Sequence, residues 1–176
     1  VIRLLTYLSD FFRTSLSNGQ NFITIQEEQR HIESYLKIQQ FRYQDTLAYN
    51  IDIDKALYNF TIPKLLLQPL VENALVHGIR GKRGKGTISV TGRLEGGNIV
   101  FCVTDDGVGM DEEQLYNLRK ASVNGSAQSA NIAAFGVGNV NERIHIYYGE
   151  KYGLFFKSQP NVGTTARVVI PARNVS

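Results

Sequence analysis

Residues 65–78 (LLLQPLVENALVHG) constrain the fold more than any other stretch of this chain. Leucine, valine and alanine fall on almost every side of the helix that this stretch predicts, which is the pattern of a helix buried on more than one side. Pro63 suits the first helical turn, where its missing N–H costs nothing, and Gly78 suits a helix terminator. We therefore expect a deeply packed helix between these two residues.

Asn73 and His77 interrupt the apolar pattern of this helix. They lie four residues apart, so they project from one face as a polar pair. A buried amide and a buried imidazole need partners, which are either hydrogen bonds inside the protein or a ligand. For a helix alone, a pair satisfied within the core is the simpler interpretation, but the loops that follow favour a ligand.

The composition limits the class of protein. The 176 residues, 43% of them hydrophobic and 20% charged, fit one domain, or one domain with a helical appendage. A net charge of +3 favours an anionic ligand only weakly and gives no reason to expect nucleic acid. The single cysteine, Cys102, excludes an internal disulfide and suits a reducing compartment. No apolar run approaches the roughly 20 residues that a membrane helix needs.

Two helices are predicted before the central stretch. Apolar spacing predicts the first over residues 2–16. Thr24 and Glu27 have the form of a capping box and open the second, which runs to about residue 43. His31 lies on this second helix among Glu and Arg residues, so we expect it in solvent.

The rest of the chain alternates strands with glycine-rich loops. Apolar residues alternate with polar ones over residues 47–53, which predicts a half-buried strand. Residues 87–94 and 99–104, joined through two glycines, predict a hairpin, and two further strands close the chain at 154–157 and 164–170. Residues 80–86 (RGKRGKG) are interpreted first as a solvated turn. The second interpretation is that they assist in binding a phosphate.

Residues 105–110 (DDGVGM) follow the hairpin directly. A plain turn is one interpretation. The other is a ligand site, because two glycines after a strand that ends in Asp let the backbone approach a ligand closely, and Asp105 can accept a hydrogen bond from an exocyclic amine. The alternating acidic ligands of a calcium loop are missing. Asp111 is expected to cap a short helix to about residue 120.

The second glycine-rich stretch lies further along the chain. Residues 121–134 are rich in small and polar residues and are expected to form a mobile lid. Residues 135–143 (FGVGNVNER) predict a glycine-rich turn that leads into a helix to about residue 148. Such a turn offers free N–H groups and the positive end of a helix dipole to a phosphate.

This ordered set of features resembles the GHKL nucleotide-binding fold shared by histidine kinases, gyrase, Hsp90 and MutL. Residues 67–74 (LQPLVENA) and 139–144 (NVNERI) are similar to the LytS/YesM-type sensor histidine kinases of bacteria, and the similarity runs from about residue 5 to 171. The resemblance implies an α/β two-layer sandwich (α+β, the Bergerat fold), with a mixed sheet and helices on one face. It also implies a helical stem over residues 1–44, part of the dimerisation region, and a catalytic ATP-binding domain over residues 45–176.

The resemblance also implies roles for individual residues. Asn73 matches the asparagine that holds the Mg²⁺ bridging the nucleotide phosphates, and His77 matches a position near those phosphates; both are candidates for catalysis. Asp105 matches the aspartate that reads the adenine amino group, beside a wall shaped by Gly107 and Gly109. The other nucleotide-binding residues implied are Gly78, Met110, Gly136, Val137, Gly138 and Thr164.

Two departures from the family pattern matter. Ala134 stands where the family has the first glycine of the second glycine box, so a stiffer lid hinge is expected. The phosphate-accepting histidine, which in the family lies in a His-Phe-Leu/Phe-Asn-like segment just before a helix like that at 2–16, is absent. We therefore expect that the chain is a fragment that begins after this histidine.

The function implied is transfer of a phosphoryl group from ATP to a histidine and then to an aspartate on the receiver domain of a response regulator. A GHKL ATPase would have a glutamate four residues before Asn73, where this chain has Pro69, so a kinase is favoured; Glu72 is expected to have a structural or orienting role. The alternatives are a nucleotide-binding module that transfers nothing, or an ATPase. A homodimer anchored in the bacterial membrane is implied for the full-length protein, with this part in the cytoplasm and touching neither membrane nor nucleic acid.

Overall fold

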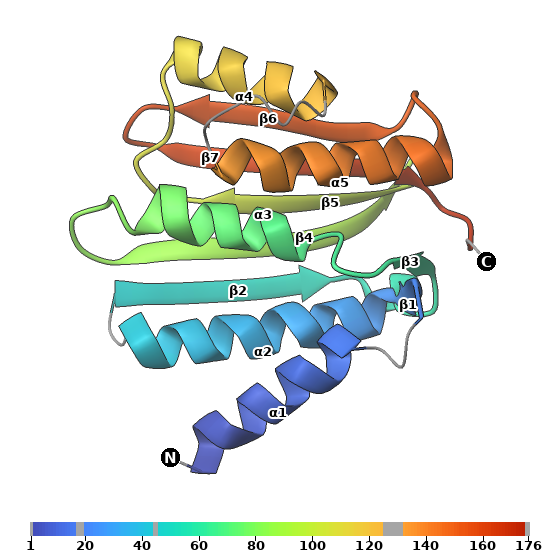
Figure 1. Cartoon of the computed structure of the whole chain (residues 1–176), viewed down its shortest axis with the longest axis horizontal. Coiled ribbons are helices and arrows are strands. Elements are labelled where there is room, and N and C mark those ends of the chain that lie inside the picture. The colour runs from blue at the N-terminus through green and yellow to red at the C-terminus, as the bar shows by residue number, and fades with distance from the viewer. Residues whose placement is uncertain (1, 17–19, 44–45, 125–131, 175–176) are drawn as a thin grey trace.

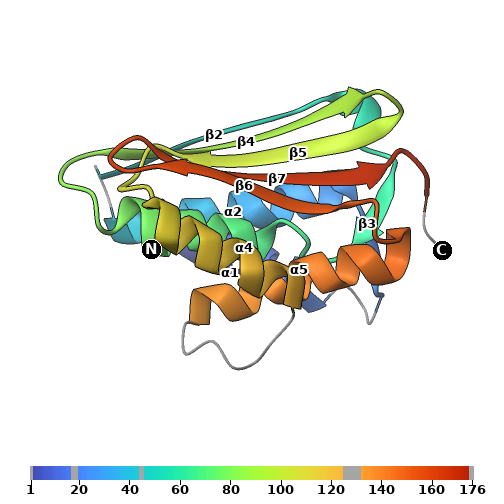
Figure 2. The same cartoon turned by 90° about the horizontal axis from the view of Figure 1, so that it is seen from above.

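The computed structural model describes residues 2–16, 20–43, 46–124 and 132–174. They form two layers, a sheet and a set of helices that all lie on one of its faces (Figures 1 and 2). In chain order the elements are α1 (Ile2–Leu16), β1 (Phe22–Thr24), α2 (Ile25–Tyr43), β2 (Leu47–Ile53), η3 (Lys55–Leu57), β3 (Thr61–Pro63), α3 (Gln68–Asn73), η4 (Ala74–Ile79), β4 (Gly86–Glu95), β5 (Asn98–Asp105), α4 (Glu112–Asn124), α5 (Ile132–Tyr148), β6 (Gly153–Gln159) and β7 (Gly163–Pro171). None of the described helices combines the length and the apolar character needed to cross a bilayer.

The main sheet has five strands in the order β2-β4-β5-β7-β6. β2 pairs with β4 in parallel, and the other neighbours pair antiparallel, so the sheet is mixed. The predicted hairpin is confirmed: β4 and β5 are joined by Gly96 and Gly97, whose φ angles of 56° and 79° suit a tight turn. The two-layer sandwich expected from the sequence is therefore confirmed.

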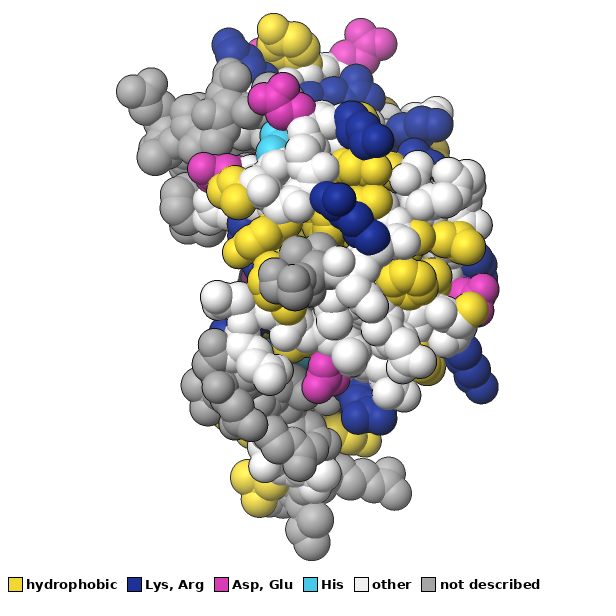
Figure 3. Space-filling model, turned by 90° about the vertical axis from the view of Figure 1, so that its right-hand side faces the viewer, with side chains coloured by type: hydrophobic (Ala, Val, Ile, Leu, Met, Phe, Trp, Pro, Cys, Tyr) yellow, Lys and Arg dark blue, Asp and Glu magenta, His cyan; other side chains and the backbone are white. Residues whose placement is uncertain are grey.

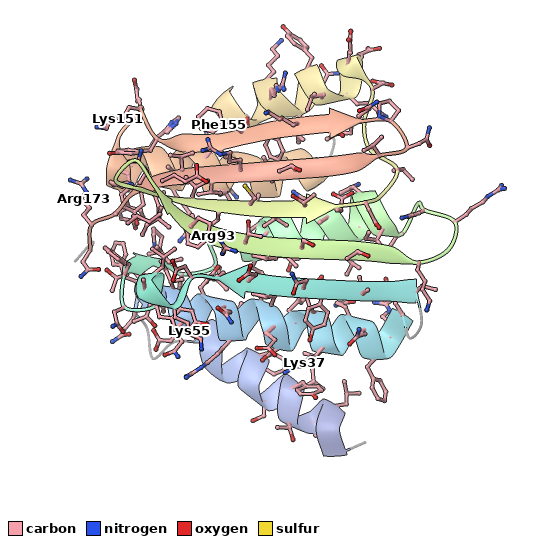
Figure 4. All side chains as sticks on the ribbon, turned by 180° about the vertical axis from the view of Figure 1, so that it is seen from behind. Lys37, Lys55, Arg93, Lys151, Phe155 and Arg173 are labelled. Atoms are coloured by element: carbon pink, nitrogen blue, oxygen red, sulfur yellow. The ribbon has the colours of Figure 1, made fainter. Side chains whose placement is uncertain are left out.

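The core lies between the sheet and the helices, because the strands alternate between apolar and polar residues. The opposite face of the sheet carries the other residues of each strand, among them Arg93 and Phe155 (Figure 4). There Arg93 pairs with Asp52, and Thr104 lies 3.0 Å from Thr165 between hydroxyl oxygens. The fully buried core residues include Ile32, Leu36, Leu67, Ile88, Val90, Phe101, Val140, Ile144 and Val168.

The capping box that opens α2 is confirmed, but the expectation that His31 lies in solvent is wrong. The Thr24 N–H donates to Glu27 Oε2 at 2.7 Å, and the Glu27 N–H donates to Thr24 Oγ1 at 3.2 Å. His31 is only 1% exposed, because α1 packs across α2 and stacks Phe11 on the imidazole at 4.6 Å between ring centroids. Burial lowers the pKa of His31 to about 4.

The central helix begins later than the sequence predicts. Pro63 ends β3 and is not in the first helical turn, which instead contains Pro69. Gly78 does not terminate the helix but lies inside η4, a π-helical turn in which the Arg80 N–H bonds to the Leu75 carbonyl five residues earlier at 3.0 Å. The leucines before residue 68 belong to the connection from β3, so their apolar pattern was not that of a helix.

The second glycine box is also different from the prediction. Gly136 and Gly138 lie inside α5 and not in a turn before it. The reason is that Val137, Val140 and Ile144 are almost fully buried at helical spacing, and burial of such side chains contributes about 1.5–3 kcal/mol each, more than the roughly 1 kcal/mol that a helical glycine costs.

The helix capped by Asp111 is confirmed as α4, although it extends to Asn124. The Gln114 N–H donates to Asp111 Oδ1 at 2.8 Å, and the Asp111 N–H donates to Gln114 Oε1 at 3.0 Å. Residues 125–131 of the expected lid lie outside the described residues, and the remainder of the lid segment belongs to α4 and α5.

Candidate functional site

The asparagine–histidine pair predicted from the sequence lies on the helical segment formed by α3 and η4. This segment lies over the middle of the sheet and runs roughly along its strands, and η4 contacts β4, β5 and β7 (Figure 1). Asn73 is half-buried at the junction and makes no capping hydrogen bond to η4, whereas His77 is exposed. π-helical turns are rare and occur frequently at functional sites, which agrees with a binding role for this junction.

The end of this segment interlocks with the loop that follows β5. A Cβ atom on Gly78 would lie 2.4 Å from Asp105 Oδ1, and a Cβ atom on Gly107 would lie 2.3 Å from the Gly78 carbonyl oxygen. The Val108 N–H also donates to the Gly78 carbonyl at 3.2 Å. Both glycines are therefore required for the contact, which brings two of the predicted motifs together.

Asp105 is a buried carboxylate at the end of β5. It is 5% exposed, its Oδ1 accepts a hydrogen bond from the Gly107 N–H at 3.0 Å, and the Thr164 N–H favours its charged form. Burial raises the pKa of Asp105 above its ordinary value of 3.8, and these backbone donors act in the opposite direction. The result is a fixed acceptor that can receive a hydrogen bond from an amino group.

Two further glycines let backbone segments near Asp105 pass close to one another. Gly163 has a φ of 128°, and a Cβ atom there would lie 1.9 Å from the Asp105 carbonyl oxygen. Gly109 has a φ of 64°, and a Cβ atom there would lie 1.9 Å from the Gln159 carbonyl oxygen. The loop after β5 and the turn between β6 and β7 are thus held against each other, as the Asn161 N–H bond to the Val108 carbonyl at 2.7 Å also shows.

Ser158 is a residue of this region that the sequence reasoning missed. Its Oγ accepts the Met110 N–H at 2.8 Å, lies 2.8 Å from Thr164 Oγ1 and donates to the Gly163 carbonyl at 3.0 Å. It therefore joins β6, β7 and the loop after β5. The available signal was a serine in an inward-facing position of a strand whose other inward positions, Leu154 and Phe156, are apolar.

The second glycine box lies against the first turn of α3. A Cβ atom on Gly136 would meet only the Pro69 Cβ, at 3.8 Å, and Val137 and Gly138 are buried. α5 thus places this box beside the helix that leads to Asn73 (Figure 1). The second glycine box therefore lies near the helix that bears Asn73, as expected, but it is helical and does not form a turn with free N–H groups.

The basic loop over residues 80–86 is mostly exposed, as a solvated turn should be. Lys82 forms an ion pair with Asp106 at 3.1 Å, and the same carboxylate accepts the Thr87 N–H at 2.7 Å. These contacts join the loop to the residue next to Asp105.

Comparisons with known proteins agree with this geometry. Residues 61–174 match the family described as histidine kinase-, DNA gyrase B- and HSP90-like ATPase, and residues 1–47 match a family described as histidine kinase. The sensor histidine kinase YesM of Bacillus subtilis is 32% identical over 174 residues, 99% of this chain and 28% of that protein. The sensor protein LytS of Staphylococcus haemolyticus is 31% identical over 98% of this chain and 29% of that protein. The chain spans less than a third of the length of these relatives.

Solved structures show the same fold. The histidine kinase domain of the Erythrobacter litoralis blue-light activated kinase EL346 has a TM-score of 0.60 at 17% identity, covering 97% of this chain and 73% of that chain. The catalytic domain of histidine kinase ThkA has a TM-score of 0.61 at 13% identity, covering 88% of this chain and 97% of that chain. The predicted resemblance is confirmed, and the chain belongs to the family of histidine kinase-, DNA gyrase B- and HSP90-like ATPases.

Proposed function

We propose that this chain is the ATP-binding catalytic part of a sensor histidine kinase, which transfers a phosphoryl group from ATP to a histidine for relay to a response-regulator aspartate. The observation that carries the proposal is the interlock of Gly78, Asp105 and Gly107, which sets a buried carboxylate against the helical segment that bears Asn73. The names of the relatives, sensor histidine kinase and sensor protein, support the kinase assignment.

In this proposal Asp105 accepts a hydrogen bond from the adenine amino group, and Gly107 and Gly109 let the base approach the backbone. The Gly107 N–H holds Asp105, Thr164 pairs with Asp105 across β5 and β7, and Ser158 connects Thr164 to Met110. Because these contacts are all made within the protein, the adenine acceptor is positioned before any nucleotide arrives.

Asn73 is proposed as the residue that would hold a Mg²⁺ ion at the nucleotide phosphates, with His77 beside them. The described residues contain no cluster of three or more His, Cys, Asp or Glu side chains that could hold a metal ion. Mg²⁺ in kinase sites uses only one or two protein oxygens and completes its shell with phosphates and water, so a single half-buried amide fits this metal. Bound there, Mg²⁺ supplies charge neutralisation for phosphoryl transfer, and the protein supplies positioning.

The residues around Asn73 favour transfer to a histidine over hydrolysis. Pro69, in the preceding turn of α3, has no group that could accept a proton from water. Glu72 is exposed, and its Oε1 accepts a hydrogen bond from Gln68 Nε2 at 2.8 Å, which supports an orienting role within the helix. The homodimer, the receiver-domain partner and the membrane anchoring concern the full-length protein and stay predictions from the resemblance.

Two measurements test the proposal. Calorimetric titration with Mg²⁺-ATP and Mg²⁺-GTP should show binding that prefers ATP. Incubation with γ-labelled ATP and a separately purified acceptor segment that carries a phosphorylatable histidine should give acid-labile label on the acceptor. Asn73→Ala should abolish this label while the circular dichroism spectrum stays unchanged, since the substitution removes a metal ligand from a half-buried position. Steady release of phosphate without acceptor labelling would instead identify an ATPase.

A further inference from the structure

Glu28, in the first turn of α2, is a fully buried carboxylate outside the site described above. Its Oε2 accepts the Leu65 N–H at 2.9 Å and its Oε1 accepts the Leu67 N–H at 2.8 Å, and the Gln68 N–H acts with these two donors to lower the pKa of the carboxyl group. Burial raises the pKa of Glu28 above its ordinary value, against the effect of these three donors. A carboxylate is costly to bury, so this position depends on the hydrogen bonds that it makes.

Leu65 lies in the connection from β3, Leu67 is the N-cap residue of α3 and Gln68 is its first residue, so these N–H groups lie where the chain enters the helix that leads to Asn73. The first N–H groups of a helix have no partner within the helix, and Leu67 at the N-cap position makes no side-chain cap. Glu28 therefore supplies from α2 the cap and the negative charge that the helix start lacks. Leu65 has a φ of 56°, a conformation that a non-glycine residue keeps only where its surroundings hold it.

Arg143 of α5 holds the same segment from its carbonyl side. Its Nη2 donates to the Lys64 carbonyl at 2.7 Å, and its Nη1 donates to the Leu65 carbonyl at 3.5 Å. Leu65 thus donates to Glu28 and accepts from Arg143. We name this arrangement the clamp: Glu28, Arg143 and residues 64–68.

The clamp lies at the opposite end of the α3–η4 segment from Gly78 (Figure 1). Figure 3 shows this end of the molecule, where Lys and Arg side chains are spread over the surface among apolar ones. Asn73 follows Gln68 on one short helix, which at 1.5 Å per residue places it only about 8 Å further along the axis. A shift in the position of the first residues of α3 should therefore also shift the position of Asn73.

We propose that Glu28 is a positioning residue for nucleotide binding: through the clamp, α2 sets the orientation of Asn73 toward the phosphates. This inference rests on the proposed function and deepens it, because it connects α2 to the phosphate end of the site. The adenine end does not depend on the clamp, since Asp105 is held by the Gly107 N–H at the end of β5, which pairs there with β7. Loss of the clamp should thus weaken recognition of the phosphates and leave recognition of adenosine intact.

The test compares Glu28→Gln with wild type by calorimetric titration with Mg²⁺-ATP and with adenosine, at a temperature where circular dichroism shows both proteins fully folded. The amide keeps the size of the side chain but replaces one acceptor by a donor that faces an N–H group. We expect the Mg²⁺-ATP affinity to fall about tenfold, within the range typical of coupling between sites, while the adenosine affinity stays unchanged. Glu33→Gln is the matched control, because Glu33 lies on the same helix in a half-exposed ion pair with Lys37 and should change neither affinity.

Arg143→Lys is the second variant and decides the matter if Glu28→Gln does not fold. Lysine keeps the positive charge but lacks the guanidinium group whose two nitrogens reach both carbonyls. The same selective loss of Mg²⁺-ATP affinity is therefore expected. If wild type binds Mg²⁺-ATP and the folded variants bind it equally well, the inference is overturned while the proposed function stands. If the variants lose affinity for Mg²⁺-ATP and for adenosine equally, the clamp has only a structural role, and the inference is overturned in that case too. A wild-type chain that binds neither probe would contradict the proposed function itself.

Discussion

Gly78 and Asp105 are packed so closely that a Cβ atom on the glycine would lie 2.4 Å from Oδ1 of the carboxylate. The two residues come from different motifs, 27 positions apart in the sequence. Because Asp105 is also held by backbone N–H groups, it cannot move aside without losing hydrogen bonds. The contact thus makes the geometry of the acceptor depend on the absence of a side chain at position 78.

Gly78→Ala should therefore displace the Asp105 carboxylate. Overpacking of this kind typically costs about 1–3 kcal/mol of stability, and the affinity for ATP should fall with it because the adenine acceptor moves. Thermal unfolding and calorimetric titration of the same sample measure both effects. A variant with wild-type stability and wild-type ATP affinity would show that the contact is not needed.

Gly136→Ala is the matched glycine substitution and should have the opposite effect on stability. A Cβ atom there meets only Pro69 Cβ at 3.8 Å, an ordinary contact, and the residue lies inside α5. Replacing a helical glycine by alanine should stabilise the nucleotide-free protein by about 0.5–1 kcal/mol. ATP affinity should nevertheless fall, because a phosphate-binding turn at residues 136–138 would have to form from a more stable helix. Unchanged ATP affinity would show that the phosphates do not use this turn.

Asp105→Asn should weaken binding of adenine nucleotides in particular. The amide can donate as well as accept, so it no longer provides an obligate acceptor for the adenine amino group. Loss of one buried hydrogen bond of this kind corresponds to about 1–3 kcal/mol, which is roughly a fivefold to 150-fold loss of ATP affinity. Calorimetric titration with ATP and GTP measures the loss and the change in preference.

The control for this substitution is Asp52→Asn, since Asp52 pairs with Arg93 on the opposite face of the sheet and should not change the affinity for ATP.

The pH dependence of ATP binding gives a second check on Asp105. Burial raises the pKa of Asp105, so wild-type ATP affinity should fall as the pH is lowered toward that raised value. Asp105→Asn should lose this component of the pH dependence. An unchanged affinity and preference in the variant would count against Asp105 as the adenine acceptor.

His31 should make the stability of the α1–α2 contact depend on pH. Burial lowers its pKa from 6.5 to about 4, so the unfolded chain binds this proton more readily than the folded one. The stability that neutral His31 contributes is therefore fully present above pH 6.5 and is lost as the pH falls toward 4. His31→Phe keeps the ring beside Phe11 and removes the titration. Its melting temperature should fall less than that of wild type between pH 7 and pH 4.5, and parallel profiles would exclude this role.

Local patterns explain which parts of the fold could be predicted. The five strands of the main sheet, the hairpin and the caps at Thr24 and Asp111 depend on residues close in sequence, and they could be predicted. The strands β1 and β3, three residues each, pair only with each other and were not predicted. The start of α3 could not be predicted because it is fixed by Glu28, which lies 37 residues before Leu65, and not by a local cap. His31 was misjudged for a related reason, since its burial depends on a second helix.

In the candidate site, too, the features that depend on local sequence could be predicted and those that depend on distant contacts could not. The Asp105 loop and the Asn73 helix could be recognised from their motifs, and the structure places Gly78, Gly107 and Asp105 in direct contact. The helical state of Gly136 followed from burial of its neighbours against the sheet, which the glycine pattern does not reveal. Ser158 links three segments that are distant in sequence, so its role could not be predicted from the sequence and is seen only in the folded structure.

The last prediction concerns the histidines of this chain, which are His31, His77 and His145. His31 is buried under Phe11 and cannot reach a nucleotide without separation of α1 from α2. His145 is half-buried, with its Nε2 within 3.4 Å of where a Cβ on Gly153 would lie, and His77 is proposed to lie beside the phosphates rather than to accept one. Incubation with Mg²⁺ and γ-labelled ATP should therefore leave no acid-labile label on the purified chain, even at nucleotide concentrations that saturate binding. Strong acid-labile labelling that disappears in His31→Phe would show that α1 opens and that His31 is the acceptor.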